Sequence, residues 1–279
     1  LEAIIKAFEL FASHISQEGA LFLCADDPIT RNLNVPEKLR TITYGINTAS
    51  DLMAENISLH PFGSSFDLLV GGQNYGRFHL EVPGRHNVLN SLPVIGFCLE
   101  VGLALETIQT GFAVFHGAGR RFEIKGQVEG VTVIDDYGHH PNEIKATLEA
   151  ATSLGARRVV VVFQPHRYSR TLFLSQEFGR CFDNCDKLFI TDIYAASEKP
   201  IPGVTSKVIL DHMPVAHRRK VKMVKNVEDV KYHLLNYVEP GDVIFTIGAG
   251  SITRIGPEIL ESMKARSLSY SAIPVSAAV

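Results

Sequence analysis

The segment Asp135-Asp136-Tyr137-Gly138-His139-His140-Pro141 follows the apolar run 131–134 and precedes a helical pattern over 142–154. An apolar strand that ends in carboxylates, a glycine and histidines places ionisable groups at the carboxyl edge of a sheet, where open α/β sheets bind ligands. Such groups are costly to bury unless they are paired or take part in chemistry. We therefore interpret this first segment as a functional site. The alternative is a solvated loop in which Pro141 begins a helix.

A second charged segment, Gln-Pro-His-Arg-Tyr-Ser-Arg-Thr at 164–171, follows the run 158–163. Five consecutive apolar residues in that run indicate a strand that is buried on both faces, as in a parallel sheet. We expect His166, Arg167 and Arg170 at the same sheet edge as the first segment, on an adjacent strand. Arginine binds carboxylate and phosphate well, so the two segments together predict an anionic ligand.

Strand and helix patterns alternate after residue 130, which predicts a doubly wound, mainly parallel α/β sheet with right-handed crossovers. The expected strands are 131–136, 158–163, 187–192, 221–224 and 242–247, and the expected helices are 141–154, 172–184, 226–238 and 252–264.

The first part of the chain has a different pattern, with helices expected at 1–16, 86–101 and 105–115, strands at 20–25 and 41–46, and an antiparallel hairpin within 51–82. Lys125-Gly126 resembles a hinge. We predict one domain over 1–123, a second over 124–266, and a disordered Ser/Ala-rich tail over 267–279.

Composition fits a globular enzyme, with 46% hydrophobic and 20% charged residues and a formal net charge of -3. That charge argues against a nucleic-acid-binding protein, which needs a broad basic surface. No apolar stretch approaches the ~20 residues of a membrane span. Cys181 and Cys185 have a spacing that could chelate a metal, but core thiols in a reducing cytoplasm explain the four cysteines better, because no second ligand pair is present.

Five motifs in order resemble the Mur ligase family over nearly the whole chain. They are Pro-Gly-Arg-His-Asn-Val-Leu-Asn at 83–90, Gly-Arg-Arg-Phe-Glu at 119–123, the two charged segments described above, and Pro-Ile-Pro-Gly-Val-Thr-Ser at 200–206. The resemblance implies a partial central domain followed by a Rossmann-like C-terminal domain, in a cytoplasmic enzyme of peptidoglycan synthesis.

The resemblance also implies a reaction. These ligases use ATP and Mg²⁺ to form an acyl phosphate, which an amine then attacks. The motifs are most similar to the member that joins L-alanine to UDP-N-acetylmuramate. Alternatives are the recycling ligase that attaches a murein tripeptide, which residue 137 and the 194–206 loop disfavour, and a nucleotide-binding module without catalysis. The oligomeric state and any enzyme fused after Val279 are left open.

Residue roles follow from the same resemblance. Asn90 would contact adenine, Arg121 would reach the phosphates across the domain cleft, and Asp136 would bind the ribose hydroxyls. Site residues near the amino acid would be Tyr137, His139, Arg167 and Arg170, with Arg121 and His139 catalytic. Plainer readings also exist for two motifs: Asn87 and Asn90 as helix caps, and Arg120 as a solvated neighbour of Arg121.

The chain departs from the family in one respect. No G-x-x-x-x-G-K-[ST] phosphate loop occurs in the 279 residues, and no nucleotide-sugar domain is recognisable. We therefore expect the second half of the central domain plus the whole C-terminal domain, with the Mg²⁺ ligands in the N-terminal part that is missing, and no ligase turnover by the chain alone.

Overall fold

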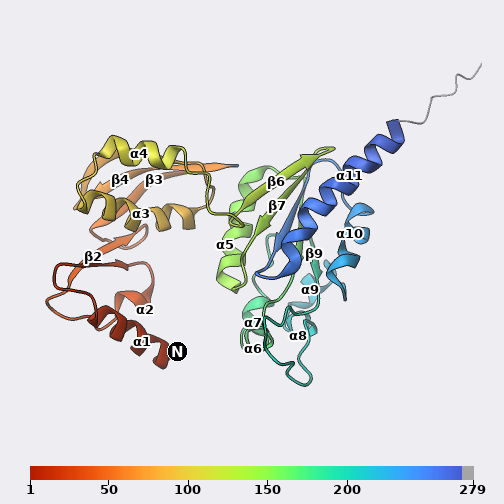
Figure 1. Ribbon diagram of the computed structural model, residues 1–279, viewed down its shortest axis with the longest axis horizontal. Coiled ribbons are helices and arrows are strands. Elements are labelled where there is room, and N and C mark those ends of the chain that lie inside the picture. Colours follow the sequence, from red (N-terminus) through yellow and green to blue (C-terminus); the bar gives the residue numbers. More distant parts are fainter. Residues whose placement is uncertain (272–279) are drawn as a thin grey trace, which may run out of the picture. The chain divides into compact units, whose positions relative to one another are not determined.

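The computed structural model describes residues 1–271 and divides into two compact units, Leu1–His116 and Gly117–Val279. Each unit has its own sheet and its own apolar core (Figure 1). None of the described helices is long and apolar enough to cross a bilayer. The boundary between the two units lies between His116 and Gly117, before the predicted domain boundary at residue 123. That residue 123 separates two functional domains stays a prediction.

The first unit is built on a five-stranded sheet of order β1-β2-β3-β4-β5. Its strands are β1 (Ala20–Cys24), β2 (Arg40–Gly45), β3 (Leu52–His60), β4 (Gly63–Val70) and β5 (Gln73–Leu80). The first three strands are parallel, whereas β3, β4 and β5 form an antiparallel meander. Gly71 and Gly72 join β4 to β5 with φ of +57° and +80°, the backbone that a tight hairpin turn requires.

The helices of this unit are α1 (Glu2–Ser13), α2 (Pro28–Arg31), α3 (Arg85–Glu100) and α4 (Leu105–Ala113). Helices α3 and α4 pack on the sheet through apolar side chains. Helix α3 buries Val88, Leu92 and Ile95 completely. Gly96 allows the close approach, because a Cβ there would lie 2.4 Å from Leu52 Cδ1.

The second unit contains a six-stranded sheet of order β10-β9-β8-β11-β7-β6. Its strands are β6 (Glu123–Val128), β7 (Val131–Asp136), β8 (Arg158–Phe163), β9 (Lys187–Ile190), β10 (Val221–Met223) and β11 (Asp242–Ile247). Every pairing is parallel except that of β6 with β7. The predicted α/β class with a mainly parallel sheet is confirmed.

Helices cover both faces of this sheet (Figure 1). They are α5 (Pro141–Ala151), η1 (Thr152–Leu154), α6 (Tyr168–Phe173), α7 (Ser175–Phe178), α8 (Lys207–Asp211), α9 (Val215–Arg218), α10 (Val227–Leu235), η2 (Ser251–Arg254) and α11 (Ile255–Ser271). Val161 and Phe163 of β8 pack with α5 and α7, whereas Val160 and Val162 pack with α10 and α11. This alternation explains why β8 is apolar from Val159 to Phe163.

Three local features differ from the expectations. Lys125-Gly126 is not a hinge but a bulge in β6, where the register shifts and Gly126 has φ +151°. The helix expected at 172–184 begins earlier, at Tyr168, and is broken into α6 and α7. Helix α11 continues to Ser271, and the rest of the expected disordered tail lies outside the described residues.

The cysteines are free, and Cys181 and Cys185 are buried. Burial raises the pKa of Cys185 to about 12. These two residues are therefore core thiols, whereas Cys24 and Cys98 are half-buried.

Candidate functional site

The two charged segments lie at one edge of the second sheet, after β7 and β8. The prediction that these strands share a sheet is confirmed. The prediction that they are adjacent is wrong, because β11 lies between them and pairs with both. The edge is therefore built from three loops, 137–140, 164–167 and 248–250, and the third belongs to the last strand in the sequence.

Asp135 is fully buried at the end of β7 and forms an ion pair with Arg120. Its carboxylate accepts from Arg120 Nε at 3.0 Å and from the hydroxyls of Thr246 and Thr253 at 2.6 and 2.8 Å. Arg120 Nη2 also donates to the carbonyl oxygen of Gly248 at 2.6 Å. Arg120 is thus not a solvated neighbour. It joins the segment before β6 to both β7 and β11.

Asp136 holds the turn that follows β7. Its Oδ2 accepts from the amide of Phe122 at 2.9 Å, and its Oδ1 accepts from the amide of Gly138 at 2.7 Å. The side chain is 4% exposed, and burial raises its pKa above the usual value despite these hydrogen bonds. A Cβ at Gly138 would lie 2.7 Å from Oδ1, so this turn needs glycine. The ribose contact stays a prediction, and it would use the lone pairs that the two amides leave free.

Glu143 caps the start of α5. Its Oε2 accepts from the amides of His139 and His140 at 2.9 and 3.1 Å, and His140 Nδ1 accepts from the amide of Asn142 at 3.3 Å. This reciprocal arrangement is a capping box. Burial raises the pKa of Glu143, but these amides and the nearby His139 and Arg121 lower it below its ordinary value. Glu143 is therefore an ionised carboxylate beside the site.

Arg121 is held loosely beside this cap. Its side chain is 48% exposed, and its Nη1 lies 3.4 Å from Glu143 Oε1. Its guanidinium carbon lies 5.5 Å from the centre of the Tyr137 ring, which Arg120 also contacts at 4.8 Å. A guanidinium has five N–H donors, so Arg121 keeps most of its donors for a bound anion.

Arg167 ends the loop after β8 in a left-handed conformation, with φ +71°. Its amide donates to the carbonyl oxygen of Tyr194 at 2.8 Å, and the amide of Tyr194 donates to that of Pro165 at 2.8 Å. Such a backbone costs about 1–3 kcal/mol and persists because the loop after β9 holds it. The exposed Arg167 guanidinium makes no hydrogen bond to another residue in the described part of the chain.

Ser169 and Glu198 tie the start of α6 to the loop after β9. Glu198 accepts from the amide and the hydroxyl of Ser169 at 3.1 and 2.6 Å. These bonds lower the pKa of Glu198. The sequence does not predict this pair, because a glutamate in a loop that is simply solvated has the same sequence pattern.

Four rings form a row along the sheet edge. The ring of Tyr137 lies 5.3 Å from that of His139, His139 lies 5.8 Å from His166, and His166 stacks on Tyr194 at 5.7 Å. Burial lowers the pKa of His166, and the charges of Arg170, His139 and Arg167 lower it further. His166 is therefore neutral near pH 7.

Gly250 lets the third loop pack beneath this row. A Cβ there would lie 2.5 Å from Gln164 Oε1 and 2.6 Å from Tyr194 Cγ. Gln164 Oε1 also accepts from the amide of Ile252 at 3.1 Å. Sequence reasoning gave Gln164 no role, and this packing explains the glycine at position 250.

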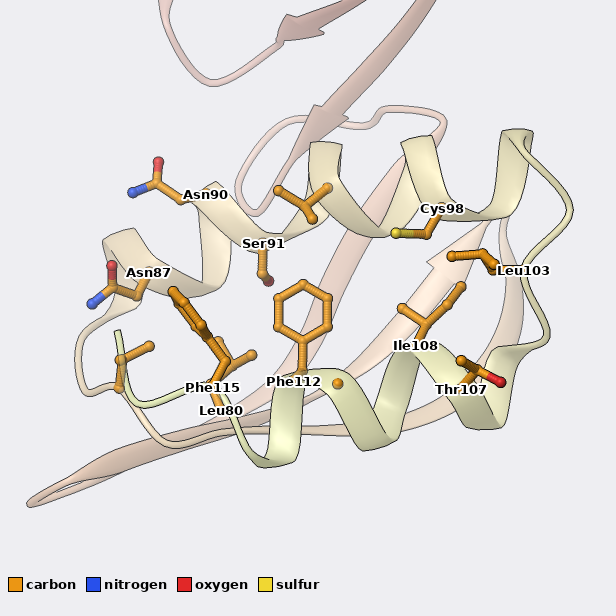
Figure 2. Close-up of a pocket in the computed structure, with 13 residues that line it drawn as sticks. Leu80, Asn87, Asn90, Ser91, Cys98, Leu103, Thr107, Ile108, Phe112 and Phe115 are labelled. Atoms are coloured by element: carbon orange, nitrogen blue, oxygen red, sulfur yellow. The ribbon is translucent and has the colours of Figure 1, made fainter. Parts of the chain in front are cut away.

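Asn90 belongs to the first unit and is not one of the residues at the sheet edge of the second unit. It is exposed on α3 at the border of a cavity of about 520 Å³ between α3 and α4. Figure 2 shows Ser91 and Phe112 pointing toward each other across this cavity, with Asn87 and Asn90 at one end. Helix α3 has Gly84 at its N-cap and no side-chain cap, so the reading of Asn87 and Asn90 as helix caps is wrong. Asn87 Nδ2 instead donates to the carbonyl oxygen of Pro83 at 2.7 Å, whereas Asn90 makes no such bond within the described residues.

No group of three or more His, Cys, Asp or Glu side chains within residues 1–271 could hold a metal ion. The sheet edge thus offers cations, imidazoles and hydroxyls, which suit an anionic ligand and proton transfer.

Two family models match the chain. The Mur ligase middle domain matches residues 1–98, and the glutamate ligase domain of Mur ligases matches residues 120–250. Among curated proteins, the chain is 43% identical to the UDP-N-acetylmuramate–L-alanine ligase of Solibacter usitatus, over 95% of this chain and 56% of that protein. It is 41% identical to the ligase of the same name from Syntrophus aciditrophicus, over 95% and 55%. The chain thus spans about half the length of these relatives.

Solved structures show the same fold. The UDP-N-acetylmuramate–alanine ligase of Thermotoga maritima matches with a TM-score of 0.72 and 25% identity, over 88% of this chain and 51% of that one. MurF of Acinetobacter baumannii matches with a TM-score of 0.74 and 19% identity, over 93% and 55%.

Proposed function

Since this chain belongs to the Mur ligase family, we propose that it takes part in the ATP-dependent joining of L-alanine to UDP-N-acetylmuramate in peptidoglycan precursor synthesis. The observation that carries the proposal is the sheet edge where Arg121, His139, Arg167 and Arg170 gather around loops that Asp135 and Asp136 anchor. The names of the curated relatives favour L-alanine as the amine.

The reaction needs a carboxylate to be activated and an amine to be held close to it. ATP would supply the phosphoryl group that turns the muramic acid carboxylate into an acyl phosphate. Amide formation then depends on positioning the amine and on removing a proton from it. Mg²⁺ would neutralise part of the negative charge on the phosphates during phosphoryl transfer.

Arg121 would stabilise charge on the phosphate oxygens. Phosphoryl transfer builds negative charge on oxygen atoms, and a preorganised guanidinium lowers the energy of that state. Its half-exposed side chain, oriented only by Glu143 and Tyr137, is free to meet such a group.

The amino acid would lie beside the row of rings. A carboxylate needs a cation, and the guanidinium of Arg167 has no hydrogen bond to another described residue, while Arg170 lies one helical turn further on, in α6. Tyr137 and His139 complete this side of the pocket.

The nucleotide would be bound by Asn90 and Asp136. The carboxamide of Asn90 has no hydrogen bond to another described residue and lies beside an apolar cavity, and a carboxamide can both donate to and accept from an adenine edge. Asp136 would accept from the ribose hydroxyls.

A joined protein tests the proposal. This chain is fused to the part of the Solibacter usitatus ligase that it does not match, and phosphate release is measured with ATP, Mg²⁺, UDP-N-acetylmuramate and L-alanine. We expect turnover that requires both substrates, and background release from the 279 residues alone. Turnover with the murein tripeptide but not with L-alanine would identify a recycling ligase instead, and no turnover with either would reject ligation.

A further inference from the structure

His139 and His166 are neighbouring rings with opposite hydrogen-bonding partners. Nδ1 of His139 lies 3.0 Å from the carbonyl oxygen of Tyr137 and 3.6 Å from Glu143 Oε2. Both of these oxygens only accept hydrogen bonds. Nδ1 of His139 therefore carries the proton, and in the neutral ring Nε2 is left as an acceptor.

The partner of His166 is a donor. Nδ1 of His166 lies 3.2 Å from Arg170 Nη1, and a guanidinium has no acceptor atom. Nδ1 of His166 therefore accepts, and its proton sits on Nε2. Burial and the nearby Arg170, His139 and Arg167 lower the pKa of His166, which keeps this ring neutral.

The two histidines thus offer one proton acceptor and one proton donor from rings whose centres are 5.8 Å apart. An α-amino acid presents the complementary pair: an ammonium group that must lose a proton before it can attack, and a carboxylate that accepts hydrogen bonds. The arginines of the edge cannot take the proton, because guanidinium stays charged in proteins.

We propose that His139 Nε2 accepts the proton of the incoming ammonium group while His166 Nε2–H donates a hydrogen bond to the carboxylate of the same amino acid. This inference rests on the proposed function. In the step, one N–H bond of the ammonium breaks and an Nε2–H bond forms, so the amine becomes neutral and His139 becomes a cation. The Tyr137 carbonyl oxygen and the Glu143 carboxylate face its Nδ1–H and stabilise that cation.

Histidine tautomers can be read directly by NMR. The 279-residue chain is labelled with ¹⁵N-histidine, and His139→Gln and His166→Gln assign the two rings by loss of their signals. In the neutral rings, we expect His139 to show a protonated Nδ1 and a bare Nε2, and His166 to show the reverse. The same tautomer in both rings would overturn the proposal.

A matched pair of variants tests the role of Arg170. Arg170→Met should release His166 Nδ1 and shift its signals toward a mixture of tautomers. Arg167→Met removes the same charge but no hydrogen bond, so the His166 tautomer should persist. Equal effects of the two variants would show that charge alone sets the tautomer, which contradicts the geometry on which the proposal stands.

Three small ligands test separately the binding of the ammonium group and that of the carboxylate. We expect L-alanine to shift the signals of both histidines, L-alaninamide to shift those of His139 alone, and propionate to shift those of His166 alone. A His166 response to L-alaninamide equal to that to L-alanine, or no response to any ligand, would overturn the pairing. These measurements need no ATP, so loss of turnover in the joined ligase with the shifts intact would reject ligation and leave the histidine assignment standing.

Discussion

Arg120 Nε lies 3.0 Å from Oδ2 of Asp135, a carboxylate with no exposed surface. The pair joins the segment before β6 to β7, the strand next to β6 in the sheet, and the residue that follows Arg120 is Arg121. One arginine of the Arg-Arg motif is therefore structural, and the other is free to bind.

Arg120→Ala should destabilise the second unit by about 3 kcal/mol, because removing one partner of a buried pair leaves an uncompensated charge. Urea unfolding of the 279-residue chain, followed by circular dichroism, measures the loss. Arg121→Ala is the matched control and should change stability by less than about 0.5 kcal/mol, as is usual for an exposed side chain. If Arg120→Ala lowers the free energy of unfolding no more than Arg121→Ala does, the ion pair with Asp135 contributes little to stability.

Strand positions were predictable where burial alone decides them. The runs 131–136, 158–163 and 242–247 match β7, β8 and β11 residue for residue, because a strand buried on both faces is apolar over most of its length. Strand order was not predictable, because the hydrophobic pattern of β11 does not tell which two strands it lies between. The insertion of β11 depends on contacts between residues more than a hundred positions apart.

The candidate site was predictable as a set of residue types but not as a set of partners. Carboxylates and arginines at strand ends indicate a ligand. Only the structure shows that Arg120 is paired with the buried Asp135, whereas Arg121 is half-exposed and available to a ligand. The same limit applies to Asp136. The carboxylate oxygens of Asp136 accept hydrogen bonds from two backbone amides. Asp136→Ala would therefore disturb the turn as well as any ribose contact, so this variant does not test nucleotide binding alone.

In the joined ligase, Arg121→Ala should lower kcat by about two to three powers of ten, the usual effect of losing a preorganised donor to the transition state. Steady-state phosphate release measures this. Lys145→Ala removes an exposed cation from α5 and should leave kcat unchanged. A kcat within a factor of about two of the unmodified protein would exclude Arg121 from the phosphate site.

Arg167→Ala or Arg170→Ala should raise the KM for L-alanine about ten-fold or more, given ~1.5–3 kcal/mol for a hydrogen bond to a charged group. The KM for ATP should stay nearly constant in the same joined ligase. Arg180→Ala, an exposed arginine beyond α7, is the control and should change neither constant. If ATP binding weakens while L-alanine binding is spared, the two arginines are phosphate ligands, and the amino acid must bind elsewhere.

The lowered pKa of His166 predicts how stability changes with pH. Its folded-state pKa lies below the ordinary 6.5, with burial as the main cause and with the charges of Arg170, His139 and Arg167 opposed only by Glu198. Above about pH 6.5 the His166 ring is neutral in both the folded and the unfolded chain, and its neutral form does not reduce the stability of the fold. As the pH falls, the unfolded chain binds the proton first, so stability is lost until the folded-state pKa is reached.

Urea midpoints measured through this pH range should therefore fall more steeply for the unmodified chain than for His166→Gln, which has no proton to bind. Arg170→Met should lie between the two, because removing that cation brings the folded-state pKa of His166 closer to its ordinary value. Parallel pH profiles for all three proteins would mean that His166 titrates normally. The ring would then be protonated in mild acid, and its Nδ1 could not accept from Arg170 there.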